Sequence, residues 1–106
     1  MKVLESGDGV CITGTRYLGT VKADYEQLVR VFGEPLKGSD KTTCEWNVEI
    51  YDEEFDSEHV VALYDWKETD WTTCRSTPDY EWNIGGKDVM DMYALLDVLE
   101  AEGVVK

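Results

Sequence analysis

The sequence predicts an α+β domain in which an antiparallel sheet of three to five strands carries two helices packed on one face. Segments of alternating polar and apolar residues indicate strands, and two segments with apolar residues at helical spacing indicate helices. A chain of 106 residues, 42% of them hydrophobic, is long enough to bury one core. We therefore expect residues 1–106 to form a single domain.

The first segments of the chain favour β structure. Met1 to Gly9 is expected to form a short strand or an arm. Val10 to Lys22 is rich in β-branched and aromatic residues but contains Gly14 and Gly19, which predicts a strand or a bent hairpin.

The clearest helix is predicted from Asp24 to Phe32. Its apolar residues recur at i, i+3, i+4 and i+7: Tyr25, Leu28, Val29 and Phe32. Asp24 and Gln27 have the spacing of a capping box. Gly33 can adopt the left-handed conformation that ends a helix, and Pro35 prevents continuation. Residues 34–41 are then expected to form a polar loop.

The stretch from Thr43 to Trp66 predicts two strands joined by an acidic turn. Alternate apolar residues define one face of each strand: Cys44, Trp46, Val48 and Ile50 in the first, and Val60, Ala62, Tyr64 and Trp66 in the second. We assign this inner face, including Trp46, Tyr64 and Trp66, to the core. The turn, Asp52 to Glu58, places five carboxylates around Phe55.

The remainder predicts a long loop, a strand and a helix. Lys67 to Asp79 is the loop, Tyr80 to Ile84 alternates as a strand, and Gly85-Gly86 is expected to break it. The helix should run from Asp88 to Glu102 and stop at Gly103. Its predicted buried face is Val89, Met92, Tyr93, Leu96 and Leu99. Because Met90, Leu95 and Val98 widen that face, we expect this helix to be covered on more than one side or to lie in a partner interface.

Charge restricts the classes of partner. The net charge is −13, and all of the excess lies in residues 45–106, because residues 1–44 hold six acidic and six basic side chains. Such a charge repels nucleic acid and anionic membranes, so we expect neither direct nucleic-acid binding nor membrane binding. The favoured partner is the basic surface of another protein.

The acidic turn and its neighbours are therefore the candidate partner-binding surface, which could imitate a phosphate backbone. A solvated face that only confers solubility is the alternative. An exposed Trp71 in a polar loop would also suit an interface. The candidate residues are Glu45, Glu49, Asp52, Glu53, Glu54, Phe55, Asp56, Glu58, Asp65, Glu68, Asp70 and Trp71.

Two other functions stay open. Gly85, Gly86 and Lys87 lie between a predicted strand and a predicted helix, where backbone N–H groups can hold an anion. A nucleotide there would place its phosphate on Lys87 and its base on Tyr80 or Trp82, although the segment lacks Rossmann and P-loop spacing. The third function is a structural or interaction protein that forms a homodimer through its second helix or a sheet edge.

The sequence predicts no metal, no cofactor and no catalytic residue, and hence no enzyme. Cys44, His59 and Cys74 could supply zinc ligands, but they lack CxxC or HxxxH spacing. Acidic residues alternate in the turn as calcium ligands do, yet the turn lacks the central glycine and the span of an EF-hand. With three cysteines and no secretory signal pattern, we expect a cytoplasmic protein.

Four short patterns resemble a group of small, functionally uncharacterised proteins encoded in bacteriophage genomes. They are Tyr25-x-x-Leu28-x-x-x-Phe32-Gly33-x-Pro35, Asp40-Lys41-x-x-x-Glu45-Trp46, Ala62-x-Tyr64-Asp65-Trp66-Lys67 and Trp82-x-Ile84-Gly85-Gly86. The resemblance implies a phage product acting in the host cytoplasm. It implies a role in blocking a host nucleic-acid-handling or defence protein, such as a CRISPR effector, restriction enzyme or polymerase.

Overall fold

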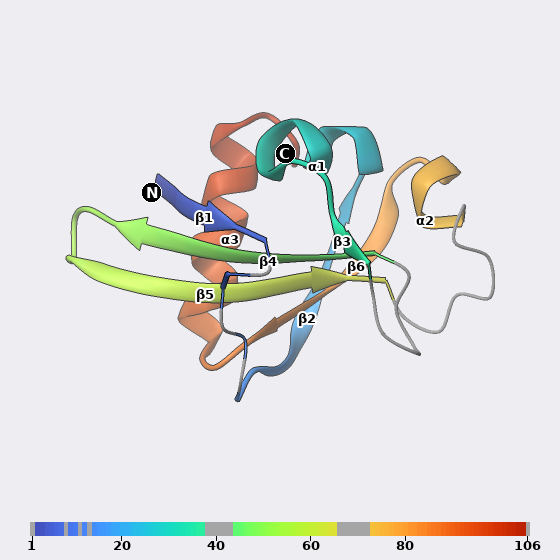
Figure 1. The fold of residues 1–106 in the computed structure, drawn as a ribbon. Coiled ribbons are helices and arrows are strands. Elements are labelled where there is room, and N and C mark those ends of the chain that lie inside the picture. Colours follow the sequence, from blue (N-terminus) through green and yellow to red (C-terminus); the bar gives the residue numbers. More distant parts are fainter. Residues whose placement is uncertain are drawn as a thin grey trace.

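The computed structural model describes residues 2–7, 9–10, 12, 14–37, 44–65 and 73–105, and it confirms the α+β class. The antiparallel sheet has the strand order β1-β4-β5-β6-β2 (Figure 1). A short strand, β3, pairs with the start of β4, on the same edge of β4 that pairs with β1 further along. The elements are β1 (Lys2–Ser6), β2 (Arg16–Ala23), α1 (Tyr25–Phe32), β3 (Leu36–Lys37), β4 (Cys44–Asp52), β5 (Ser57–Tyr64), α2 (Thr73–Ser76), β6 (Tyr80–Gly86) and α3 (Val89–Ala101).

The hairpin of β4 and β5 forms the centre of the sheet. Trp46 and Val48 are buried on the face covered by α3, as predicted for β4. Their partners across the strands are Leu63 and Val61, which are fully buried. The predicted face of β5 is therefore wrong by one residue, and Tyr64 is half-buried on the opposite face. Val60 to Leu63 is apolar throughout, so alternation could not fix which residues face the core.

Helix α1 packs on the same face as α3 and is held at both ends by indole groups. Trp46 Nε1 donates to the Gly33 carbonyl and Trp82 Nε1 to the Ala23 carbonyl, each at 2.9 Å. The two indoles meet edge to face at 5.1 Å. In the last turn of α1, Arg30 Nη2 donates to the Glu102 carbonyl at 2.7 Å, which links α1 to the C-terminal end of α3. The two helices thus share one core, as expected.

The ends of α1 differ in detail from the prediction. Asp24 is the N-cap residue, but its side chain caps no helical N–H and instead accepts from Asp79 N at 2.7 Å. The predicted capping box is therefore wrong. Gly33 has a positive φ of 86°, with ψ at −167° outside the left-handed helical region. The predicted polar loop after it contains β3, whose Leu36 lies opposite Glu45.

The first two strands lie at opposite edges of the sheet, and the segment from Val10 to Lys22 supplies a strand, β2, rather than a hairpin. β1 pairs with β4, and Gly7 N continues that pairing by donating to the Asn47 carbonyl at 2.9 Å. β2 pairs with β6 at the other edge. Val10, which lies between these two strands in the sequence, is buried.

The long loop predicted after the hairpin contains α2, a single helical turn. Trp66, Glu68, Asp70 and Trp71 lie outside the described residues, so the predictions about them stay predictions. The described part resumes at α2, which lies next to α1.

The predicted buried face of the last helix is right only in part: Leu99 is buried, and Met92 and Leu96 are partly buried against the core. Val89 and Tyr93 are exposed, whereas Asp91, Ala94, Leu95, Val98 and Leu99 are buried against the sheet. Because the helix has apolar residues on all of its sides, the helical periodicity does not identify a single buried face. Val89, Met90 and Tyr93 are exposed, and the expectation that this helix lies in a partner interface stays a prediction.

Candidate functional site: an acidic and aromatic groove

The turn between β4 and β5 is built by its own carboxylates. Asp52 is only 8% exposed, and its Oδ1 accepts from Glu54 N at 3.0 Å and Phe55 N at 3.3 Å. Asp56 has a φ of 50°, and its carboxylate accepts from the Tyr51 hydroxyl. That hydrogen bond raises the pKa of Tyr51 above its ordinary value. This folding leaves Phe55 73% exposed at the tip.

A groove of about 530 Å³ lies between this turn and α3. Its lining combines carboxylates with apolar side chains and includes neither Lys nor Arg among the described residues: Asp52, Glu53, Glu54, Phe55, His59, Met90, Tyr93, Ala94, Asp97 and Ala101. Met90 and Tyr93 are half-exposed, at 55% and 50%. The volume falls within the range of small-ligand pockets, but the sides are acidic and open to solvent.

The two walls of the groove are joined by His59 of β5 and Asp91 of α3. His59 Nδ1 lies 2.8 Å from Asp91 Oδ1, and both side chains are 12% exposed. The other oxygen of Asp91 accepts from Lys87 N at 3.0 Å and Asp88 N at 3.2 Å, which completes a capping box at the start of α3. Because the carboxylate accepts at Nδ1, the proton of a neutral His59 lies on that nitrogen.

Ser57 completes a chain of three polar side chains in the order hydroxyl, imidazole, carboxylate. Its Oγ lies 3.3 Å from His59 Nε2. A nucleophilic serine also needs N–H donors that stabilise an oxyanion. Among the described residues at this turn, the N–H groups of Glu54 and Phe55 already donate to Asp52, and the surrounding carboxylates oppose a developing negative charge. The chain is therefore better explained as an anchor between hairpin and helix.

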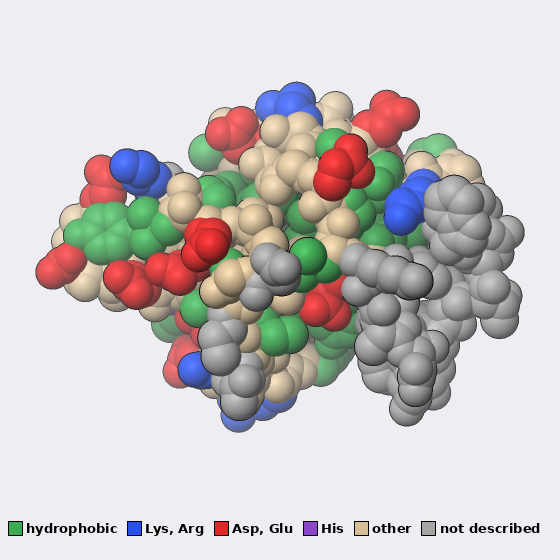
Figure 2. Space-filling view, viewed as in Figure 1, with side chains coloured by type: hydrophobic (Ala, Val, Ile, Leu, Met, Phe, Trp, Pro, Cys, Tyr) green, Lys and Arg blue, Asp and Glu red, His purple; other side chains and the backbone are tan. Residues whose placement is uncertain are grey.

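The structure divides the predicted acidic surface. Glu53, Glu54 and Phe55 lie in the groove with Asp52, and Asp56 is exposed at the turn. Strand alternation places Glu45, Glu49 and Glu58 on the face opposite α3. Figure 2 shows acidic side chains around an apolar patch at the hairpin tip.

The prediction that Asp65 belongs to the partner-binding surface is wrong. Its carboxylate is fully buried beside Cys44, whose N–H donates to Oδ1 at 3.2 Å. It therefore cannot contact a partner at the surface.

The alternative nucleotide site loses its main components. β6 continues through Gly85 and Gly86, and neither glycine has a positive φ, so the expected break is wrong. The N–H of Lys87 donates to Asp91, an internal anion. Trp82 is fully buried and cannot stack on a base, and the partly buried Tyr80 packs against it with ring centroids 4.8 Å apart.

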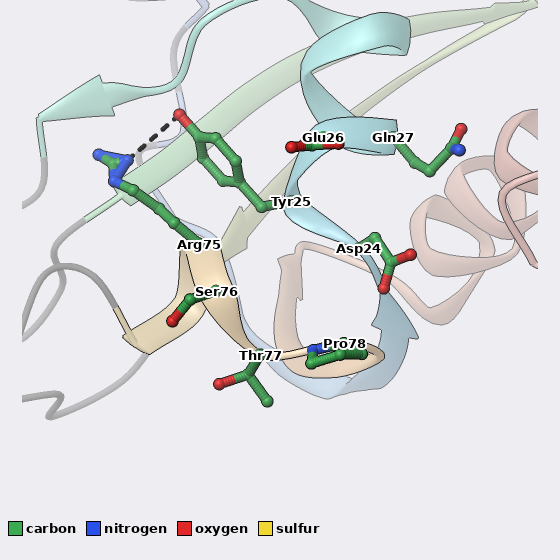
Figure 3. A pocket seen from close by; sticks show the side chains of 8 residues that line it. All are labelled: Asp24, Tyr25, Glu26, Gln27, Arg75, Ser76, Thr77 and Pro78. Carbon is green, nitrogen blue, oxygen red and sulfur yellow. Dashed lines mark hydrogen bonds between the residues drawn. The ribbon is translucent and has the colours of Figure 1, made fainter.

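A second hollow, of about 220 Å³, lies where α1 begins beside α2 (Figure 3). Arg75 lies over the Tyr25 ring at 4.9 Å and donates from Nη1 to its hydroxyl at 3.2 Å. Burial raises the pKa of Tyr25 and the Arg75 charge opposes that rise. The carboxylates of Asp24 and Glu26 line the same hollow and offset the positive end of α1, so it does not suit an anion.

Sequence reasoning missed the contribution of α3 to the groove. Helix α3 is oriented so that Asp91 points toward the sheet. This orientation places Met90, Tyr93 and Asp97 in the groove beside the acidic turn. The available signal was the excess of apolar residues around that helix. No sequence spacing pairs His59 with Asp91, because the two residues lie 32 positions apart in the chain.

No protein-family model, curated protein or solved structure matches the chain. Within the described residues, no helix is long and apolar enough to cross a membrane.

Proposed function

We propose that the chain binds a basic segment of another protein in the groove between the β4–β5 turn and α3. The observation that carries this proposal is the lining itself: four carboxylates stand around Phe55, Met90 and Tyr93, without Lys or Arg among the described lining residues. Apolar side chains left exposed in a concave, charged surface are typical of a protein interface.

Arginine side chains suit this lining better than other groups. A guanidinium can donate two parallel hydrogen bonds to a carboxylate such as Glu53 or Glu54 while its flat face stacks on Phe55 or Tyr93. The mixture of ion pairing and stacking selects a basic peptide segment over a simple cation. It also selects against nucleic acid, whose phosphates the same carboxylates repel.

A second copy of the chain is a poorer occupant. A symmetric dimer through this groove would bring the carboxylates of Glu53, Glu54 and Asp97 against their own counterparts. Like charges placed opposite each other across a protein interface destabilise the complex by roughly several kcal/mol. The charge therefore favours a different, basic protein.

Proteins that handle nucleic acid carry basic surfaces for phosphate, so they form the proposed partner class. The resemblance to phage-encoded proteins motivates a host defence or nucleic-acid enzyme in the host cytoplasm as the target. Covering its basic surface would inhibit it. The acidic residues on the opposite face, Glu45, Glu49 and Glu58, would add to the long-range attraction without lining the groove.

A matched charge experiment tests the groove. Candidate partners recovered from bacterial lysate are purified, and their affinity is measured by calorimetry for the parent chain and for Glu53→Gln/Glu54→Gln. The control is Glu26→Gln/Glu81→Gln, which removes the same charge from exposed positions on α1 and β6. We expect the groove variant to bind at least fivefold more weakly than the control, and added salt to reduce the difference. Equal losses in the two variants would refute a specific groove and leave only general acidity.

A second test measures the aromatic contribution to binding, which charge alone would not produce. Phe55→Ser should weaken binding by about 1–2 kcal/mol, as for an interfacial aromatic. Tyr17→Ser on β2 is the control, because Tyr17 is also exposed, at 55%, and lies outside the groove lining. Unchanged affinity in Phe55→Ser would contradict the proposed position of the partner.

A further inference from the structure

Two cysteines and one aspartate meet in the core at the opposite end of the β4–β5 hairpin. Cys44, Asp65 and Cys74 are each fully buried, and one ligand atom of each lies within 4.8 Å of the others. Their sources are the first residue of β4, the residue after β5, and α2. The two Sγ atoms are 2.8 Å apart.

Backbone hydrogen bonds position Cys44 and Asp65 relative to each other. Antiparallel pairing sets Asp65 opposite Cys44: the Asp65 N–H donates to the Cys44 carbonyl at 3.4 Å, and the Cys44 N–H donates to Asp65 Oδ1 at 3.2 Å. The second of these bonds orients the carboxylate, as hydrogen bonds to metal ligands do.

Contacts of Arg75, the next residue after Cys74, hold α2 in place. Its guanidinium binds Tyr25, and the Tyr25 ring packs on Trp46 at 5.7 Å. Trp46 belongs to β4, the strand that begins with Cys44, so these contacts connect α2 to the strand that carries Cys44. The geometry of the cluster therefore does not depend on the thiols alone.

We propose that Cys44, Asp65 and Cys74 form a metal site for Zn²⁺ or a similar thiolate-binding divalent cation. Thiolate and carboxylate ligands both suit zinc, and three protein ligands leave one tetrahedral position for water or another donor. Binding would release the thiol protons and place a divalent charge among three anionic ligands. Since the ligands come from β4, from the residue after β5 and from α2, the ion would link α2 to the hairpin.

The alternative use of two close thiols is a disulfide. The Sγ separation of 2.8 Å lies between the bond length of about 2.05 Å and the spacing of about 3.8 Å for two thiolates bound tetrahedrally at about 2.3 Å from zinc. Small rotations of the cysteine side chains could reach either distance. The carboxylate favours the metal, because a disulfide makes no use of an oriented acidic group at the same point.

Cobalt substitution tests the site in the full chain, kept reduced and freed of metal by a chelator. Titration with Co²⁺ should produce thiolate-to-cobalt charge-transfer absorption that saturates at one equivalent, and Zn²⁺ should abolish it. Cys44→Ser and Cys74→Ser should each bind Co²⁺ at least tenfold more weakly, and Asp65→Asn should shift the visible bands. Cys11→Ser is the matched control and should keep the parent spectrum.

A second measurement needs no variant and so is independent of any folding defect. Zn²⁺ should slow alkylation of Cys44 and Cys74 relative to Cys11, as read by peptide mass spectrometry on the parent chain. Absence of the charge-transfer band, or equal alkylation with and without Zn²⁺, would overturn the proposal. Recovery of a Cys44–Cys74 disulfide from a chain that fails the Co²⁺ titration would overturn it too and identify a redox pair.

Discussion

Replacing Asp91 with alanine should separate a structural anchor from an ordinary helix cap. The Asp91 side chain is 12% exposed, and its carboxylate accepts from three donors, the N–H groups of Lys87 and Asp88 and the His59 ring. Loss of a cap costs about 0.5–2 kcal/mol. A buried donor left without its acceptor, here His59 Nδ1, costs about 1–3 kcal/mol more. We therefore expect Asp91→Ala to lower the free energy of unfolding by about 2–4 kcal/mol.

The matched control is Asp88→Ala at the preceding cap position. Asp88 is exposed, and its carboxylate caps only the first turn of α3, accepting from Met90 N at 2.9 Å and from the backbone N–H of Asp91. Its loss should cost about 1 kcal/mol. Urea denaturation followed by circular dichroism measures both variants, and a change in midpoint at constant slope reports stability.

A double-mutant cycle with His59→Asn assigns the difference to the contact between hairpin and helix. The two residues share one hydrogen bond, so we expect a coupling energy of about 1–2 kcal/mol, within the range for residues in direct contact. Additive effects, or an Asp91→Ala cost no larger than that of Asp88→Ala, would refute the anchor. The groove walls would then be held by apolar packing alone.

Two further predictions concern the sheet. Gly86→Ala should cost about 1–3 kcal/mol by overpacking, because its Cβ would lie 2.8 Å from Leu18 Cδ1 and 3.0 Å from Asp91 Cβ. Gly85→Ala, whose nearest contact is 3.4 Å, should cost less, and equal melting temperatures by calorimetry would contradict this account. Burial raises the pKa of Tyr64, so stability should hold below about pH 10 and fall as pH rises through the higher folded-state pKa. Tyr64→Phe should reduce that alkaline loss in denaturation midpoints measured across this range, and an unchanged slope would argue against it.

The sequence predicted elements wherever polar and apolar residues alternate cleanly. β4 alternates between buried Trp46 and Val48 and more polar neighbours, and the structure confirms its face. β5 lies between β4 and β6, and its run from Val60 to Leu63 is apolar on both faces. A central strand of this kind carries no period-two signal, which is why its register could be learned only from the pairing.

The candidate site was predicted in part. The acidic turn and Phe55 could be found because charge and exposure are local properties of a short segment. The second wall of the groove could not, because an apolar helix can pack in several rotations and the His59–Asp91 contact selects one. Cys44 and Cys74 are thirty residues apart with no ligand spacing, so only the tertiary fold brings them together with Asp65.

The groove and the thiol cluster occupy opposite ends of one hairpin. β4 has nine residues, which at roughly 3.3 Å per residue separates its ends by roughly 25 Å. Substitutions that far apart, with no shared partner, usually act additively. The two proposals therefore stand independently: a chain that binds Co²⁺ but loses no affinity in Glu53→Gln/Glu54→Gln would retain the metal site and reject the groove.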